Sequence, residues 1–111
     1  MVTEYQVDNY AKVGTVNTKL TQSHIDQIVA GTLTVTPIAL TETWILDLHF
    51  IKALDDVSKR FIYSQSDVNI KYQQVRAIAD IYFNNEYQDS TDCVHQLQNI
   101  NQAITGIMIV K

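Results

Sequence analysis

Residues 44–54 read WILDLHFIKAL and are the most apolar part of any segment with helical spacing in this chain. They lie within a longer stretch that opens with Thr36, a capping residue, and Pro37, whose missing N–H costs nothing at a first helical position. On a helical wheel, the apolar side chains of this stretch cover more than half of the circumference, whereas a helix packed on one side needs an arc of about 100°. The spacing therefore predicts one long central helix over about residues 37–62, contacted on at least two sides.

Further helices are predicted on both sides of this one. Residues 67–83 place apolar side chains at i, i+4 and i+7. Residues 21–30 begin with two candidate capping residues, Thr21 and Ser23, and precede Gly31, a residue typical of the position after a helix. A last helix begins after Ser90 or Thr91 and ends at Gly106. Residues 1–20 fit a short helix, and their β-branched run Val13–Val16 would suit a strand equally well.

Two short segments have the composition of strands. Residues 32–36 alternate polar and apolar side chains, which indicates a half-buried strand. Residues 107–110 are apolar throughout, which indicates a strand covered on both faces. The predicted fold is therefore mainly α: a four- to five-helix bundle around the central helix, with a minor two-stranded β element (32–36, 107–110), in a single helical domain over residues 1–111.

Composition and charge exclude several classes of function. The net charge of −4 gives no electrostatic attraction to phosphate backbones or anionic membranes, so we expect no binding to nucleic acid or membrane. One cysteine rules out an internal disulfide and favours a reducing compartment. With no secretory signal and no run of about 20 apolar residues, we expect a soluble, cytoplasmic protein.

Asp47 is the most informative polar residue, because it falls in the apolar arc of the predicted central helix. A buried carboxylate must be paired or protonated, and perturbed carboxylates collect at functional sites. Capping of a neighbouring helix or a bond to a tyrosine hydroxyl would bury it equally well. We therefore interpret Asp47 as a buried polar residue with a structural role.

No motif for catalysis, metal binding or cofactor binding is present. The sequence Asp92-Cys93-Val94-His95 combines two metal-ligand residues, but side chains two apart on a helix point to nearly opposite sides. The three glycines are isolated, so no phosphate-binding loop exists. We accordingly predict no enzyme activity, no catalytic or metal-binding residues and no cofactor.

The sequence of residues 20–31, LTQSHIDQIVAG, resembles the opening of a repressor-type helix-turn-helix, with its Leu-Thr-Gln start and turn glycine. The resemblance covers about a tenth of the chain and would imply DNA binding. Between Lys19 and Lys52, however, there is no lysine or arginine, and DNA affinity depends on neutralising phosphates. We interpret the resemblance as coincidence and keep an acidic helix-turn-helix-like regulator or DNA mimic as the alternative function.

The favoured function is a small non-enzymatic interaction or assembly protein that self-associates and binds another protein. On the predicted 67–83 helix, a second apolar stripe remains without a partner, and the last helix carries a charge-free Gln/Asn face. The candidate interface residues are Ile70, Ala77, Ile81, Ile107 and Ile109. The thirteen isoleucines suit an AT-rich bacterium or its phage, which suggests an accessory protein of a phage or mobile element.

Overall fold

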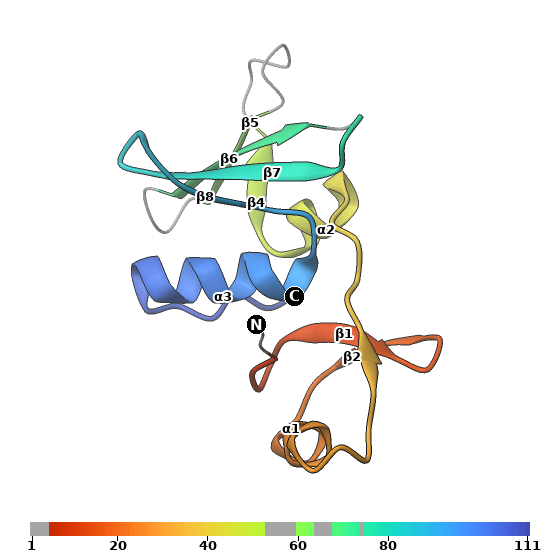
Figure 1. The fold of residues 1–111 in the computed structure, drawn as a ribbon. Helices are drawn as coiled ribbons and strands as arrows, with labels where there is room; N and C mark the ends of the chain where they lie inside the picture. The colour runs from red at the N-terminus through yellow and green to blue at the C-terminus, as the bar shows by residue number, and fades with distance from the viewer. Residues whose placement is uncertain (1–4, 53–59, 64–67, 74) are drawn as a thin grey trace.

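The computed structural model describes residues 5–52, 60–63, 68–73 and 75–111. Within these ranges the fold is mixed α/β, with a three-stranded and a five-stranded antiparallel sheet and three helices (Figure 1). The elements in chain order are β1 (Tyr10–Val13), β2 (Val16–Lys19), α1 (Gln22–Val29), β3 (Val35–Thr36), α2 (Glu42–Asp47), β4 (Phe50–Lys52), β5 (Arg60–Tyr63), β6 (Val68–Gln73), β7 (Ile78–Phe83), β8 (Glu86–Thr91) and α3 (Val94–Thr105). The predicted helical bundle is therefore wrong.

The first four elements form what we call the N-terminal unit, residues 10–36. Its sheet has the order β2-β1-β3, and the hairpin between β1 and β2 turns at Gly14, whose φ of +66° suits glycine. Residues 1–20, left open between helix and strand, thus contain two strands. The helix predicted over 21–30 is confirmed as α1, capped by Thr21 and followed by Gly31 at φ +79°.

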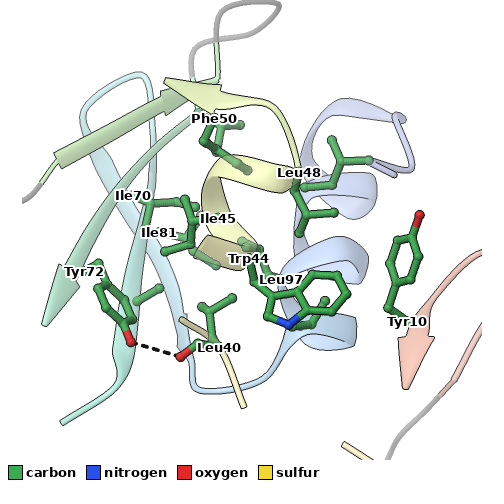
Figure 2. Packing of buried hydrophobic residues seen from close by; sticks show 14 of the residues in the cluster. Tyr10, Leu40, Trp44, Ile45, Leu48, Phe50, Ile70, Tyr72, Ile81 and Leu97 are labelled. Carbon is green, nitrogen blue, oxygen red and sulfur yellow. Dashed lines mark hydrogen bonds between the residues drawn. The ribbon is translucent and has the colours of Figure 1, made fainter. Parts of the chain in front are cut away.

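The larger sheet is a meander in which each strand pairs with the next one along the chain, in the order β4-β5-β6-β7-β8. Helices α2 and α3 precede and follow it in the chain and lie on one side of the sheet (Figure 1). Apolar side chains of both helices belong to one core cluster with residues of β6 and β7. Figure 2 shows this core, in which Trp44, Ile45 and Leu48 meet residues of β6, β7 and α3. The hydroxyl of Tyr72 donates a hydrogen bond of 2.9 Å to the backbone carbonyl of Leu40 inside the core.

The long central helix over 37–62 does not form. Helix α2 begins after Thr41, whose side chain accepts the N–H of Trp44, and ends at Asp47. His49 then adopts a φ of +75°, which a continuing helix cannot accommodate, and β4 starts at Phe50. The wide apolar arc therefore belongs to two elements, a short helix and a strand. Part of the predicted helix, residues 53–59, lies outside the described residues.

Where the structure describes it, the predicted 67–83 helix is a β-hairpin of β6 and β7; residues 67 and 74 lie outside the described residues. Strand β6 alternates strictly, with Val68, Ile70 and Tyr72 buried and the residues between them facing outward. It pairs along its whole length with β7. The polar connection predicted after residue 83 contains a turn at Asn84 and Asn85, both at positive φ, and then β8. Positive φ at both central residues is the geometry of a type I′ hairpin turn.

The C-terminal part agrees only partly with expectation. The last helix is confirmed as α3, although Cys93 rather than Ser90 or Thr91 occupies its capping position, and Gly106 ends it at φ +79°. Residues 107–110 form no strand, and of residues 32–36 only Val35 and Thr36 do so, pairing with β1. The predicted two-stranded element is thus wrong, because residues 107–111 run along α3 and β1 instead of pairing with residues 32–36.

The resemblance of residues 20–31 to a helix-turn-helix is wrong as a structural prediction. After α1 the chain turns at Gly31 and enters β3, whereas a helix-turn-helix needs a second helix directly after the turn.

Candidate functional site

The charge-free face of α3, predicted as a contact surface, is partly buried inside the molecule: Gln98 and Asn101 are buried, whereas Gln96 is exposed. Gln98 is fully buried, and its side-chain N–H groups donate to the backbone carbonyls of Asp8, at 2.9 Å, and Ile109, at 2.8 Å. Its side-chain oxygen accepts the backbone N–H of Tyr10 at 2.9 Å. Gln98 therefore joins the start of β1, α3 and the terminal segment 107–111. This role needs an uncharged amide, because an amide both donates and accepts hydrogen bonds.

Two buried polar atoms on α3 have no hydrogen-bond partner in the described part of the chain: Nδ1 of His95 and Oδ1 of Asn101. The ring of His95 lies 4.3 Å from that of Tyr5, centroid to centroid, and the residue is 4% exposed. Burial lowers the pKa of His95, although the charge of nearby Asp92 opposes the shift. The imidazole is thus held neutral in the fold.

The chemistry of Cys93 is that of a packed side chain. Burial raises the pKa of its thiol, with a smaller opposing contribution from a hydrogen bond with Thr91. A thiol, unlike a thiolate, is a poor nucleophile and a poor metal ligand. Among the described residues, no three His, Cys, Asp or Glu side chains lie close enough together to hold a metal ion.

Asp47 is not a buried polar residue. It is the last residue of α2, and its side chain is 47% exposed. The arc that was expected to bury it does not exist as one helix. Its carboxylate oxygen Oδ2 lies 4.0 Å from Nζ of Lys111, at the edge of an ion-pair contact.

The ammonium of Lys111 also contacts two aromatic rings. Nζ lies 4.1 Å from the ring centroid of Trp44 and 5.7 Å from that of Tyr10. The two rings are 5.3 Å apart and inclined at 50°, and Figure 2 shows Tyr10 of β1 beside the indole of Trp44. We call Tyr10, Trp44 and Asp47 the aromatic cage.

The predicted interface residues do not form one surface. Ile70 and Ile81 are fully buried, because they face α2 and α3 from paired positions of β6 and β7. Ala77 lies in the turn before β7 at φ +54°. In the terminal segment, Ile109 is 2% exposed and Ile107 37% exposed. The stripe of Ile70, Ala77 and Ile81 is therefore wrong as a free surface, since it assumed helical spacing in two strands.

A hollow of about 170 Å³ lies on the five-stranded sheet. It is lined by Asn69, Ile70, Lys71, Tyr82 and Asn85. Beside it, Asp80 accepts hydrogen bonds from Ser90 Oγ, at 2.6 Å, and Gln73 Nε2, at 3.2 Å. Asp80, Ser90 and Gln73 therefore satisfy one another beside the hollow.

The N-terminal unit has two strongly exposed apolar side chains. Val29 of α1 is 82% exposed and Val16 of β2 is 63% exposed. No residue of α1 is fully buried, and Ile25 and Ile28 are only partly covered. An amphipathic helix in a finished structure normally buries its apolar side.

Comparison with known proteins adds no assignment: no family model matches the chain, and no curated protein or solved structure is significantly similar to it. None of the helices within the described ranges is long and apolar enough to cross a membrane.

The sequence interpretation missed the aromatic cage. One local signal was present, because Trp44 and Asp47 are three residues apart and therefore share a side of any helix. No local pattern connects them with Tyr10 or Lys111, which come from distant parts of the chain.

Proposed function

We propose that this chain is a non-enzymatic protein-binding module that self-associates through its N-terminal unit. The observation that carries the proposal is α1, a helix with apolar residues on one side and none of them fully buried. A helix of this length is marginal in water on its own, and most helical stability in proteins comes from packing of the apolar side. Contact with a second molecule would supply that packing.

The free edge of the small sheet adds a second contact. β2 pairs with β1 on one side, and within the described residues no strand pairs with its other side. An unpaired edge is a template for strand addition. Lysine on an edge opposes such pairing, but Lys19 stands at the end of β2 with its Nζ 3.8 Å from Asp8 Oδ1. Val16, at the other end, adds exposed apolar area.

A second copy of the chain suits this surface better than a charged partner. Residues 10–36 contain only Lys12, Lys19 and Asp26 as charged side chains, so the excess of acidic residues lies elsewhere. Two copies can therefore approach here without strong like-charge repulsion. Pairing of β2 with its own copy about a two-fold axis would give a continuous sheet across an isologous interface.

The test is the mass in solution, measured by light scattering over a wide concentration range. We expect wild type to form a dimer or larger oligomer, and Val29→Asp and Val16→Asp to shift it toward monomer, because each places a carboxylate in an apolar contact. Val75→Asp is the matched control, since Val75 is 100% exposed in the turn between β6 and β7. Circular dichroism checks that each variant is folded. A wild-type monomer at every concentration would disprove self-association, and equal effects of all three substitutions would disprove that it uses the N-terminal unit.

We also propose a cytoplasmic location, on the ground that the only cysteine is buried and free. The DNA-mimic alternative stays a prediction that no feature of the described surface favours.

A further inference from the structure

The arrangement around Lys111 has the components of an ammonium-binding site. A cation is attracted to the negative face of an aromatic ring when it lies within about 6 Å of the ring centroid, and tryptophan is the best such ring. Nζ of Lys111 meets this condition for both Trp44, at 4.1 Å, and Tyr10, at 5.7 Å. Asp47 Oδ2, 4.0 Å from Nζ, supplies the compensating negative charge.

The walls of the cage are built by the fold and not by its occupant. Trp44 and Tyr10 are 9% and 8% exposed and both belong to the hydrophobic core. Trp44 is fixed in α2, and the backbone of Tyr10 in β1 is held by its hydrogen bond to Gln98 of α3. Both rings pack in the same core cluster, which includes Leu97. Rings anchored in this way keep their positions when a ligand enters or leaves.

The occupant, in contrast, is weakly held. The Lys111 side chain is 47% exposed, and neither a half-exposed cation–π contact nor a half-exposed ion pair is strong. Residues 107–111 are anchored independently, since Ile109 is buried and its carbonyl accepts a hydrogen bond from Gln98. The Lys111 side chain can thus leave the cage by rotation while the rest of the segment stays in place.

We propose that Tyr10, Trp44 and Asp47 form a binding site for an alkylammonium group, which Lys111 fills in the free protein and an external ligand takes when Lys111 is displaced. The ligand is either a lysine or methylated lysine of a polypeptide, or a small quaternary ammonium compound. The chemistry of recognition is the same for both. The proposal uses none of the residues of the self-association surface and stands independently of it.

The single tryptophan makes the site directly observable, because all indole fluorescence comes from Trp44. Wild type and Lys111→Ala are titrated with tetramethylammonium, choline, N-acetyl-lysine amide and its trimethylated form. The neutral carbon isostere of choline, 3,3-dimethylbutanol, is the matched control ligand. We expect the cations, but not the isostere, to change the emission of Trp44. Lys111→Ala should bind them about fivefold to tenfold more tightly than wild type, because no internal competitor remains.

Two further variants test whether the change in Trp44 emission comes from cation binding beside Asp47. Asp47→Asn in the Lys111→Ala background should weaken cation binding several-fold, whereas Asp89→Asn, at an exposed position of β8, should not. A stronger response to the lysine derivatives than to choline points to a polypeptide ligand, and the reverse order points to a small quaternary ammonium. The proposal is overturned if neither protein responds more to the cations than to the isostere. It is equally overturned if removing the Lys111 charge leaves affinity unchanged.

Discussion

At the scale of single residues, burial shifts the pKa of three titratable side chains among the described residues toward the neutral form. Burial raises the pKa of Tyr72 and Cys93 and lowers that of His95. The direction is the one that desolvation dictates for each type, since a low-dielectric surrounding disfavours the charged form. Asp47, which the sequence predicted to be buried, is instead exposed and contacts Lys111 at the surface.

His95 should make stability depend on pH. Its pKa is lowered in the fold, so below about pH 6.5, the ordinary histidine value, the unfolded chain binds a proton that the folded chain excludes. We expect the contribution of neutral His95 to the free energy of unfolding to be complete above that pH. At lower pH the free energy of unfolding should decrease, by at most about 1.4 kcal/mol per pH unit. Urea denaturation at pH 7.5 and pH 5 measures this.

His95→Phe is the control, because it keeps an aromatic ring against Tyr5 and does not titrate. The other two histidines, which are partly or fully exposed, remain in both proteins and cancel in the comparison. A pH dependence identical in wild type and His95→Phe would contradict the buried, neutral imidazole.

At the scale of elements, local signals predicted α1 and α3, but they misassigned the strands β4 to β7 as helix. Capping residues and glycines with positive φ mark both ends of α1 and the end of α3, and those predictions hold because such signals act within one turn. In β6, Val68 and Tyr72 are four residues apart, a spacing that shares a face in a helix and in a strand alike. The deciding residue is Ile70, whose position on the same side fits only period two.

The Asn84-Asn85 turn is needed to align β7 with β8. Asn85 has a φ of +67°, so Asn85→Ala should cost about 1–2 kcal/mol, the penalty of the left-handed conformation for an ordinary residue. Asn85→Gly should leave stability unchanged or raise it, since Asn-Gly is the favoured sequence for this turn. Thermal denaturation measures both, with Gln88→Ala as a control at an exposed position of β8. Equal losses from alanine and glycine would show that the Asn85 side chain, and not its backbone angle, matters.

At the scale of the whole molecule, the protein is elongated, with extents of 45 × 27 × 23 Å. The N-terminal unit lies at one end and the five-stranded sheet at the other, with α3 between the two sheets (Figure 1). Sequence spacing could not predict this arrangement, because the contacts that fix it join residues about ninety positions apart. The sequence showed the charge-free face of α3, but not that Gln98 on this face binds the backbone of Asp8, Tyr10 and Ile109.

Gln98 should therefore be the most sensitive polar position of the chain. Gln98→Met keeps the side-chain volume but leaves the buried carbonyl of Ile109, the part-buried carbonyl of Asp8 and the buried N–H of Tyr10 without this partner, which should cost at least about 2 kcal/mol. Gln102→Met, one turn further along α3 at a partly exposed position, is the matched control. The free energy of unfolding in urea measures both. Equal, small effects would mean that Gln98 does not hold the two ends of the molecule together.

The long separation between Tyr10 and Gln98 has a consequence for a chain that is still being made. Ribosomes add about 5–20 residues per second, so a span of 88 residues takes roughly 4–18 s to synthesise. During that interval Gln98, whose side-chain oxygen accepts the backbone N–H of Tyr10, has not yet been synthesised. The β1–β2 hairpin can form at once from neighbouring residues, whereas the docking of Tyr10 against Trp44 and α3 must wait until α3 emerges. Until then, the side chain of Tyr10, which is buried in the core of the folded protein, remains exposed to water.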